Sequence, residues 1–371
     1  MINGSWPTIT KRARHRIGDR LSELPEHVLR RILCFVDSKT TVRTSLLCRR
    51  WRSVWKGVPA LNLNRRSFHS FPSFSQFVSR ILSSRYDSAG VEEISFQLQL
   101  DKWAEMFIDA ELMYGTLFDY AASHGNLLRL RAVNCDPENV WKFFVPKAYA
   151  FRTLVTLHLE AYGGRLPGPL SGRVDPFVDF PCLRDLTLVR WYWMVDDGGL
   201  PAPVRISGIQ LRNLTIEDVP SEVEIFAPNL ESLCYKDVVW RSGFGDAHMP
   251  SLDRACVRIS GRRHLANSKD RNGGRLITPV RVAAGRLMKL FDGLASARTL
   301  ELHSDTFEIL ESIHKSFESQ ISPFTRLKTL VINVECKQKL FDIPYSLSHY
   351  FFGNPSNKET KYTKFKVTSL V

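Results

Sequence analysis

Apolar positions in the first part of the chain follow the period of an α-helix. Beyond Ser22-Glu23-Leu24-Pro25, apolar residues recur one turn apart and form a single stripe at Val28, Leu29, Ile32, Leu33 and Val36. Proline suits the first position of a helix because its missing N–H has no partner there. We predict a first helix that begins at Pro25 and ends near Val36.

Two shorter helices are predicted directly afterwards. Asp37-Ser38-Lys39 breaks the pattern, and a second helix is expected over 40–47 with Val42, Leu46 and Leu47 facing inward. A third is expected over 49–56, where Trp51 and Trp55 lie one turn apart on one face.

A different pattern follows, in which apolar-x-x-Leu-x-apolar recurs. Seven copies begin at Leu154, Leu183, Leu211, Leu230, Leu252, Ala297 and Leu327. A poorer copy covers 127–132, and 94–98 alternates like a strand. Each copy predicts a short strand with alternate residues inward. Chance could produce such hexads in a leucine-rich α/β protein, but seven copies in order favour stacked repeats.

The spacing of the copies supports a repeat of strands. Their central positions are 29, 28, 19, 22, 45 and 30 residues apart, and most intervals lie near the 20–29-residue period of leucine-rich repeats. The gap of 45 is expected to hold one degenerate unit or an insertion. The fold class is therefore predicted as α/β: a helical N-terminal module followed by an irregular solenoid of such repeats.

Alternate residues of each predicted strand face away from the leucine core, on a concave surface. The candidate target-binding residues there are His158, Glu160, Asp185, Thr187, Glu217, Lys236, Arg258 and Glu301. The same face should carry Thr215, Cys234, Arg254, His303, Val331 and Asn333. The charges run acidic, then basic, then mixed, which suits recognition of a protein better than binding of a polyanion.

The net charge of +13 is concentrated at one end of the 371-residue chain. Residues 1–66 hold 15 Lys/Arg and 4 Asp/Glu, whereas the remainder holds 36 and 34. The body therefore lacks the excess basic charge that a duplex-binding surface needs. Within residues 1–17, expected to be a disordered tail, the basic cluster 11–16 is either a nuclear-import address or a solvated charge run.

Seven cysteines without a C-x-x-C pair indicate free thiols in a reducing compartment, the cytoplasm or the nucleus. No apolar run reaches the roughly 18 residues of a membrane span, and no apolar stretch follows the basic N-terminus as in a secretory signal. Common catalytic motifs are absent, and Asp196-Asp197 before two glycines suits a turn. We expect no catalysis, no metal and no cofactor.

Two segments leave alternatives open. Trp191-Tyr192-Trp193 is either an exposed aromatic anchor or part of the core. The basic segment 261–275 is a mobile loop that could bind an acidic peptide or a phosphate, or only a loop.

Residues 19–61 resemble the plant form of the F-box. The match runs through Asp19–Glu26, Ile32-Leu33, Thr41–Ser45, Arg49–Trp55 and Val58-Pro59. The resemblance implies a partner, the small Skp-type adaptor that holds a cullin scaffold. The implied adaptor-binding residues are Leu24, Pro25, Leu29, Ile32, Leu33, Val42, Leu46 and Trp51. Packing within the module explains these apolar residues equally well, and the basic residues between them either complement an acidic adaptor or form a solvated face.

The whole chain resembles the plant F-box/leucine-rich-repeat family. We divide it into a tail at 1–17, the F-box at 18–61, a transition at 62–126, repeats at 127–340, and a tail or divergent cap at 341–371; the usual signature of the family's C-terminal FBD segment is not seen. The family implies a non-catalytic substrate-recognition subunit of a Skp–cullin–F-box ubiquitin ligase. The alternatives are an F-box scaffold outside a ligase and a nuclear nucleic-acid-binding protein that uses the basic N-terminus.

Overall fold

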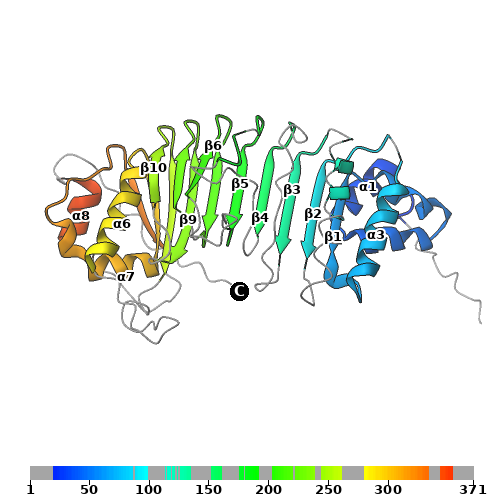
Figure 1. Ribbon diagram of the computed structural model, residues 1–371, viewed down its shortest axis with the longest axis horizontal. Helices are drawn as coiled ribbons and strands as arrows, with labels where there is room; N and C mark the ends of the chain where they lie inside the picture. Colours follow the sequence, from blue (N-terminus) through cyan, green and yellow to red (C-terminus); the bar gives the residue numbers. More distant parts are fainter. Residues whose placement is uncertain are drawn as a thin grey trace, which may run out of the picture.

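The computed structural model describes residues 20–86, 88–98, 113, 115–117, 119–121, 123, 126–134, 152–160, 175–178, 180–191, 203–219, 222–238, 244–260, 280–333 and 343–353. They form an elongated row of strands with helices gathered at both ends (Figure 1). The tail, the loop at 261–275 and the Asp196-Asp197 pair lie outside the described residues.

The N-terminal module consists of two short helices and a series of 3₁₀ turns. Helix α1 spans Glu26–Leu33 and helix α2 spans Ser38–Arg43, and 3₁₀ turns follow at Thr44–Leu46, Arg49–Arg52 and Val54–Gly57. Pro25 precedes α1 with an extended ψ of 147°, so it caps the helix instead of starting it. The predicted second helix over 40–47 and third helix over 49–56 are wrong, because the structure has only the short α2 and 3₁₀ turns there. Asp37 caps α2 by accepting a hydrogen bond from the Thr40 N–H, so α2 begins at Ser38, two residues before the predicted start, and the chain passes into a 3₁₀ turn at Thr44.

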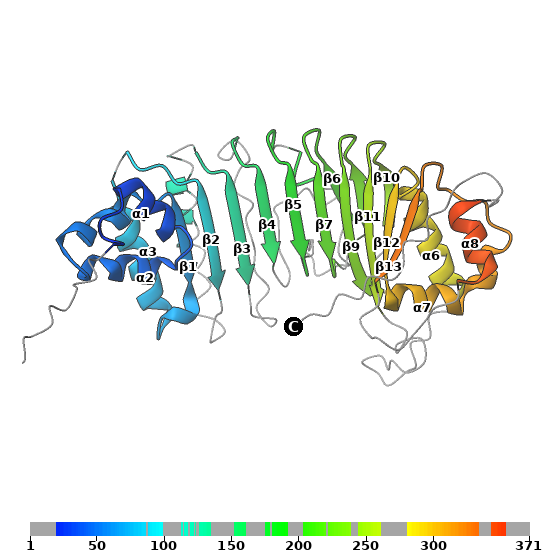
Figure 2. The ribbon, with the colours of Figure 1, turned by 180° about the vertical axis from the view of Figure 1, so that it is seen from behind.

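The body is built on one sheet of parallel strands in sequence order, seen from both sides in Figures 1 and 2. Its strands are β1 (Ala60–Asn64), β2 (Glu93–Leu98), β3 (Arg129–Asn134), β4 (Thr156–Glu160), β5 (Asp185–Val189), β7 (Asn213–Glu217), β9 (Ser232–Val238), β11 (Arg254–Ser260), β12 (Thr299–His303) and β13 (Thr329–Asn333). Every predicted hexad forms one of the last seven strands, which confirms the strand prediction. Strands β1 and β2 continue the sheet into the segment that we had treated as a transition.

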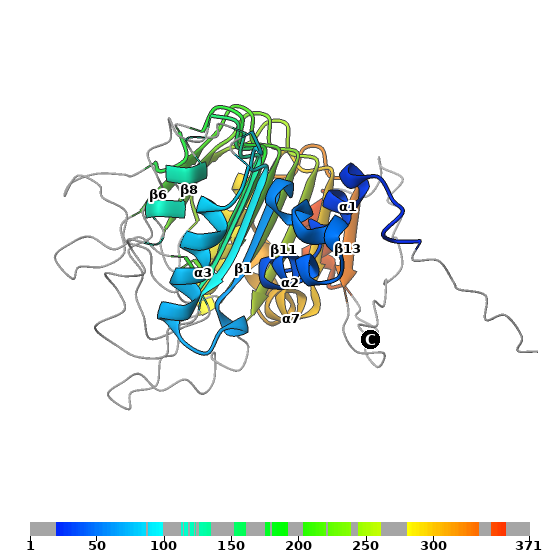
Figure 3. The ribbon, with the colours of Figure 1, turned by 90° about the vertical axis from the view of Figure 1, so that its right-hand side faces the viewer.

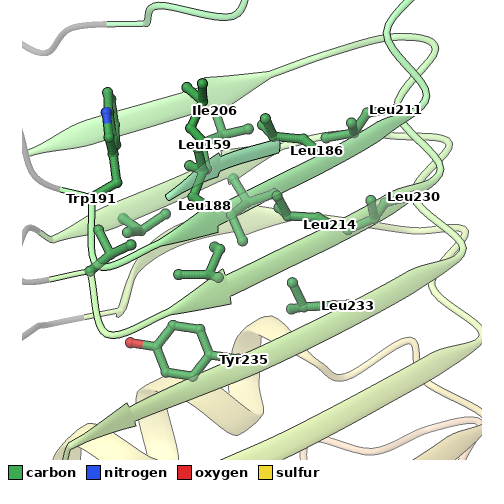
Figure 4. Packing of buried hydrophobic residues seen from close by; sticks show 14 of the residues in the cluster. Leu159, Leu186, Leu188, Trp191, Ile206, Leu211, Leu214, Leu230, Leu233 and Tyr235 are labelled. Atoms are coloured by element: carbon green, nitrogen blue, oxygen red, sulfur yellow. The ribbon is translucent and has the colours of Figure 1, made fainter. Parts of the chain in front are cut away.

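The register of the sheet stacks the central leucines. Leu157 lies opposite Leu186, Leu186 opposite Leu214, and Leu214 opposite Leu233. All four are at most 1% exposed. The core thus runs along the sheet as a ladder of equivalent apolar positions, each one closed by its neighbours (Figure 4).

A second layer covers the leucine side of the sheet. A small sheet of β6 (Val204–Ser207), β8 (Val223–Phe226) and β10 (Phe244–His248) lies on the same side as helix α3 (Phe71–Ser83) in the end-on view of Figure 3. Helices α6 (Val280–Gly293), α7 (Ser304–Ser312) and α8 (Tyr345–Phe352) gather at the far end (Figure 1). The hexad pattern gave no sign of these elements.

The long gap between two hexads contains no additional strand of the large sheet among the described residues. Ala255 of β11 pairs directly with Leu300 of β12. Helix α6 occupies part of the gap and contacts β10 through Gly293, which lies against the ring of Phe244. Of the two alternatives for this gap, the structure favours an insertion.

Candidate adaptor and target surfaces

A small core holds the N-terminal module together. It consists of Leu29, Leu33, Trp51, Val54 and Val58, each at most 3% exposed. The indole N–H of Trp51 donates to the Ser22 hydroxyl at 2.8 Å, which ties the entry segment to the last turns. Three of the predicted adaptor-binding residues, Leu29, Leu33 and Trp51, therefore pack inside the module.

Other apolar residues of the module are exposed. Leu21, Ile32, Phe35, Leu46 and Leu47 are 46, 37, 82, 85 and 66% exposed, and we call them the exposed apolar set. They make up half of the large hydrophobic side chains that are exposed in the described part of the chain. A concentration of this kind marks an interaction surface.

The exposed apolar set only partly matches the predicted adaptor residues. Ile32 and Leu46 were predicted, Pro25 is also exposed, and Leu24 and Val42 are half-buried. The prediction that Leu46 and Leu47 face inward is wrong, because both follow α2 in a tight turn that points them outward. Leu21, Phe35 and Leu47 were missed, although two adjacent leucines at 46 and 47 cannot both face inward on one short helix.

The module that carries the exposed apolar set also has an excess of basic side chains. Residues 20–56 carry nine Lys/Arg and three Asp/Glu, and Arg31, Arg43 and Arg49 are exposed. Arg30 is held by Glu26 one turn away, at 2.6 Å. The excess positive charge gives the module a potential that complements an acidic surface.

The module is joined directly to the first strand of the sheet. The Ser38 hydroxyl, 3% exposed, accepts a hydrogen bond from the Asn62 N–H at 2.8 Å. Lys39 donates to the Ser67 carbonyl and lies 4.4 Å from the centre of the Phe68 ring. Because β1 is an edge strand, these contacts both cover the edge and fix the module against it.

The opposite side of the sheet from the leucines carries the residues predicted to bind a target. Cross-strand register places His158 beside Thr187, Thr187 beside Thr215, and Glu217 beside Lys236. We call this side the polar face; it carries all eight predicted target-binding residues, each half-buried: His158, Glu160, Asp185, Thr187, Glu217, Lys236, Arg258 and Glu301. Their common placement follows from the two-residue period of a strand.

The charges on the polar face are largely paired with one another. Glu160 pairs with Arg190, and Lys236 with Glu217 at 3.0 Å. The hydrogen bond to Glu217 raises the pKa of Lys236. Burial, followed by the nearby Arg131, lowers the pKa of His158. The face therefore presents matched polar groups and little net charge.

Of the two alternatives for the aromatic segment 191–193, the structure places Trp191 in the core. Trp191 is fully buried among the core residues (Figure 4), and its ring centre lies 6.0 Å from that of Phe177. Tyr192 and Trp193 lie outside the described residues.

The described ranges hold neither a candidate metal cluster nor a candidate membrane span. These ranges contain no cluster of three side chains suited to hold a metal ion. Within them, no helix has both the length and the apolar character needed to cross a membrane.

The fold and surfaces define a class: an N-terminal helical module with an exposed apolar set, fixed to the edge of a long parallel sheet. The F-box domain matches residues 21–62. An F-box/FBD/LRR-repeat protein of Arabidopsis thaliana is 30% identical over 47% of this chain and 37% of its own length. F-box/LRR-repeat protein 13 of the same plant is 30% identical over 58% and 45%.

A further F-box protein of Arabidopsis thaliana is 26% identical over 85% of this chain and 68% of its own length. No solved structure matches the chain significantly. Together these similarities show an F-box domain at residues 21–62 and a likeness of the chain to plant F-box/LRR-repeat proteins. The chain spans less than half the length of the first two relatives.

Proposed function

We propose that this protein is the substrate-recognition subunit of a Skp–cullin–F-box ubiquitin ligase. The F-box would bind a Skp-type adaptor, which holds the cullin scaffold, and the leucine-rich-repeat solenoid would bind the target protein. The observation that carries the proposal is the exposed apolar set on the F-box, with Leu46 85% and Phe35 82% exposed.

The small size of the module supports an adaptor at this surface. Its core contains five residues, and fewer than about 50 residues rarely form a stable domain alone. The sheet supports it on one side through Ser38 and Lys39, and the exposed apolar set is left for a partner. The basic residues of the module would steer an acidic adaptor towards it.

The polar face supports a protein target. Its charges are largely paired, so the described part of this face shows no unmatched basic stripe of the kind that a nucleic acid would need. The face offers hydrogen-bonding groups in regular rows, which suits recognition of a folded surface or an extended peptide. We propose the nucleus or cytoplasm as the location.

The mechanism that follows is templating without chemistry on this chain. The adaptor would be held at the β1 end of the sheet and the target along the polar face of the same sheet, since the F-box is hydrogen-bonded to β1. Ubiquitin transfer by a partner enzyme then becomes an encounter at high effective concentration. No residue here needs to take part in the transfer.

Replacing Leu46→Ala/Leu47→Ala together tests the adaptor surface. Loss of two central apolar contacts should weaken binding of a purified Skp-type adaptor by about 2 kcal/mol or more, roughly 30-fold, in calorimetry. Ile321→Ala is the matched control, because Ile321 is 93% exposed but lies outside the F-box. Wild-type adaptor affinity in the folded double variant would overturn the assignment.

The lifetime of the bound proteins distinguishes a ligase subunit from an F-box scaffold outside a ligase. Proteins that co-purify with the wild type in cells with a blocked proteasome should be ubiquitinated and should accumulate when this protein is depleted. Bound proteins whose lifetime is unchanged by depletion would favour the scaffold outside a ligase.

A further inference from the structure

Two cysteines lie side by side on the polar face. Cys234 in β9 and Cys256 in β11 are direct partners in the register of two neighbouring parallel strands. Both are half-buried and free. Neighbouring strands lie about 4.8 Å apart, within the 4.4–6.8 Å range of Cα separations that a disulfide requires.

The two thiols differ in reactivity because Cys256 donates a hydrogen bond to Cys234. The Cys256 S–H donates a hydrogen bond to the sulfur of Cys234 and lowers the pKa of Cys234 to about 7, against the opposing effect of burial; nearby Lys236 also lowers it. The same hydrogen bond, with burial, raises the pKa of Cys256. Near neutral pH, Cys234 is therefore partly thiolate, the nucleophilic form, whereas Cys256 remains a thiol.

Other cysteines of the chain provide a contrast. Cys48 and Cys182 are exposed but are not strand residues with a cysteine opposite them. Burial raises the pKa of Cys34. A low pKa and a neighbouring thiol coincide only at Cys234 within the described part of the chain, a combination typical of redox-sensing cysteines.

We propose that Cys234 and Cys256 form a peroxide-sensitive dithiol that closes into a disulfide between β9 and β11. The Cys234 thiolate attacks one oxygen of hydrogen peroxide, so that an S–O bond forms, the O–O bond breaks and hydroxide leaves, which takes up a proton to become water. The Cys256 thiol then attacks the sulfur of the resulting sulfenic acid, and a second water leaves as the S–S bond forms. Two thiols and one peroxide thus give one disulfide and two waters.

The two cysteines lie within the polar face, so their oxidation would change the surface proposed to bind a target. Cys234 is flanked on the polar face by Thr215 of β7, and Cys256 by Glu301 of β12. Oxidation removes a partial negative charge and a hydrogen-bond donor from the middle of this row. The dithiol itself does not depend on the proposed target binding, so the chemistry can be tested without a target.

Peptide mapping of the purified full-length protein tests the proposal. After brief treatment with hydrogen peroxide near pH 7 and alkylation of remaining thiols, we expect mass spectrometry to find Cys234 linked to Cys256, with Cys48 and Cys182 still alkylated. Cys256→Ala should instead leave a sulfenic acid at Cys234 that dimedone traps. A disulfide between any other pair, or no disulfide while Cys182 oxidises, would overturn the proposal.

The pH dependence of alkylation tests the role of each thiol. A thiol with a pKa of 7 is about 50% ionised at pH 7, against about 3% for an ordinary cysteine with a pKa near 8.5. Iodoacetamide should therefore label Cys234 about tenfold faster at pH 7 than it labels a short reference peptide with an ordinary cysteine. In Cys256→Ala the half-maximal rate should move to higher pH; an unchanged profile would show that Cys256 does not activate Cys234.

Discussion

The Ser38 hydroxyl is one of the groups that join the F-box to the sheet, and Ser38→Ala removes it. The Asn62 N–H, on the outer edge of β1, donates to Ser38, which is 3% exposed. Without the hydroxyl, the partly buried Asn62 N–H loses its partner, which costs about 1–3 kcal/mol. The equilibrium constant for local opening of this junction should rise about 5- to 150-fold.

Hydrogen exchange is the assay that resolves this junction. In Ser38→Ala, amides of β1 and α2 should exchange faster by that factor, whereas those of β13 at the far end should keep their wild-type rates. Thr40→Ala is the matched control, since Thr40 lies in the same helix but is exposed. Unchanged exchange at Asn62 in the Ser38 variant would refute the view that this bond holds the F-box in place.

Two further stability predictions concern the far end of the molecule. Thr306, fully buried, accepts from the Ile259 N–H at 2.7 Å, so Thr306→Val should lower the free energy of unfolding by about 1–3 kcal/mol in urea denaturation, more than Thr306→Ser. Equal losses would contradict this reasoning. In α6, a Cβ at Gly293 would lie 2.5 Å from the Phe244 ring, whereas one at Gly285 meets nothing within 4 Å. Thermal melts should show Gly293→Ala destabilised by about 1–3 kcal/mol and Gly285→Ala stabilised by up to about 1 kcal/mol.

The strands of the large sheet could be predicted because the same local rule repeats in each. In each strand, buried leucines alternate with outward-facing polar residues. The neighbouring strands require the same alternation, so the local pattern and the tertiary environment agree. The polar face followed from that period without further information. Helices α6, α7 and α8 could not be found in this way, because their apolar residues pack against a layer whose existence the hexads do not show.

The F-box surface could be only half predicted, for a different reason. An apolar residue in a small module either packs in its core or lies exposed on its binding surface, and both uses require the same residue types. Leu33 and Ile32 are adjacent in sequence, yet one is 3% and the other 37% exposed. Turns at 44–46 decide the direction of Leu46 and Leu47, and their geometry depends on contacts with later residues.

The attachment of the F-box at β1 also keeps the proposed adaptor surface apart from the proposed dithiol. Six strand spacings lie between β1 and β9, which at about 4.8 Å each places Cys234 roughly 29 Å along the sheet from the F-box edge. Closure of a disulfide between β9 and β11 would change the polar face locally. Since the intervening strands are hydrogen-bonded in register, they have little freedom to pass that change to Ser38 or to the exposed apolar set. Peroxide should therefore alter what the polar face binds while the affinity for an adaptor stays the same, and a shared loss of both would indicate general unfolding instead of a switch at the target surface.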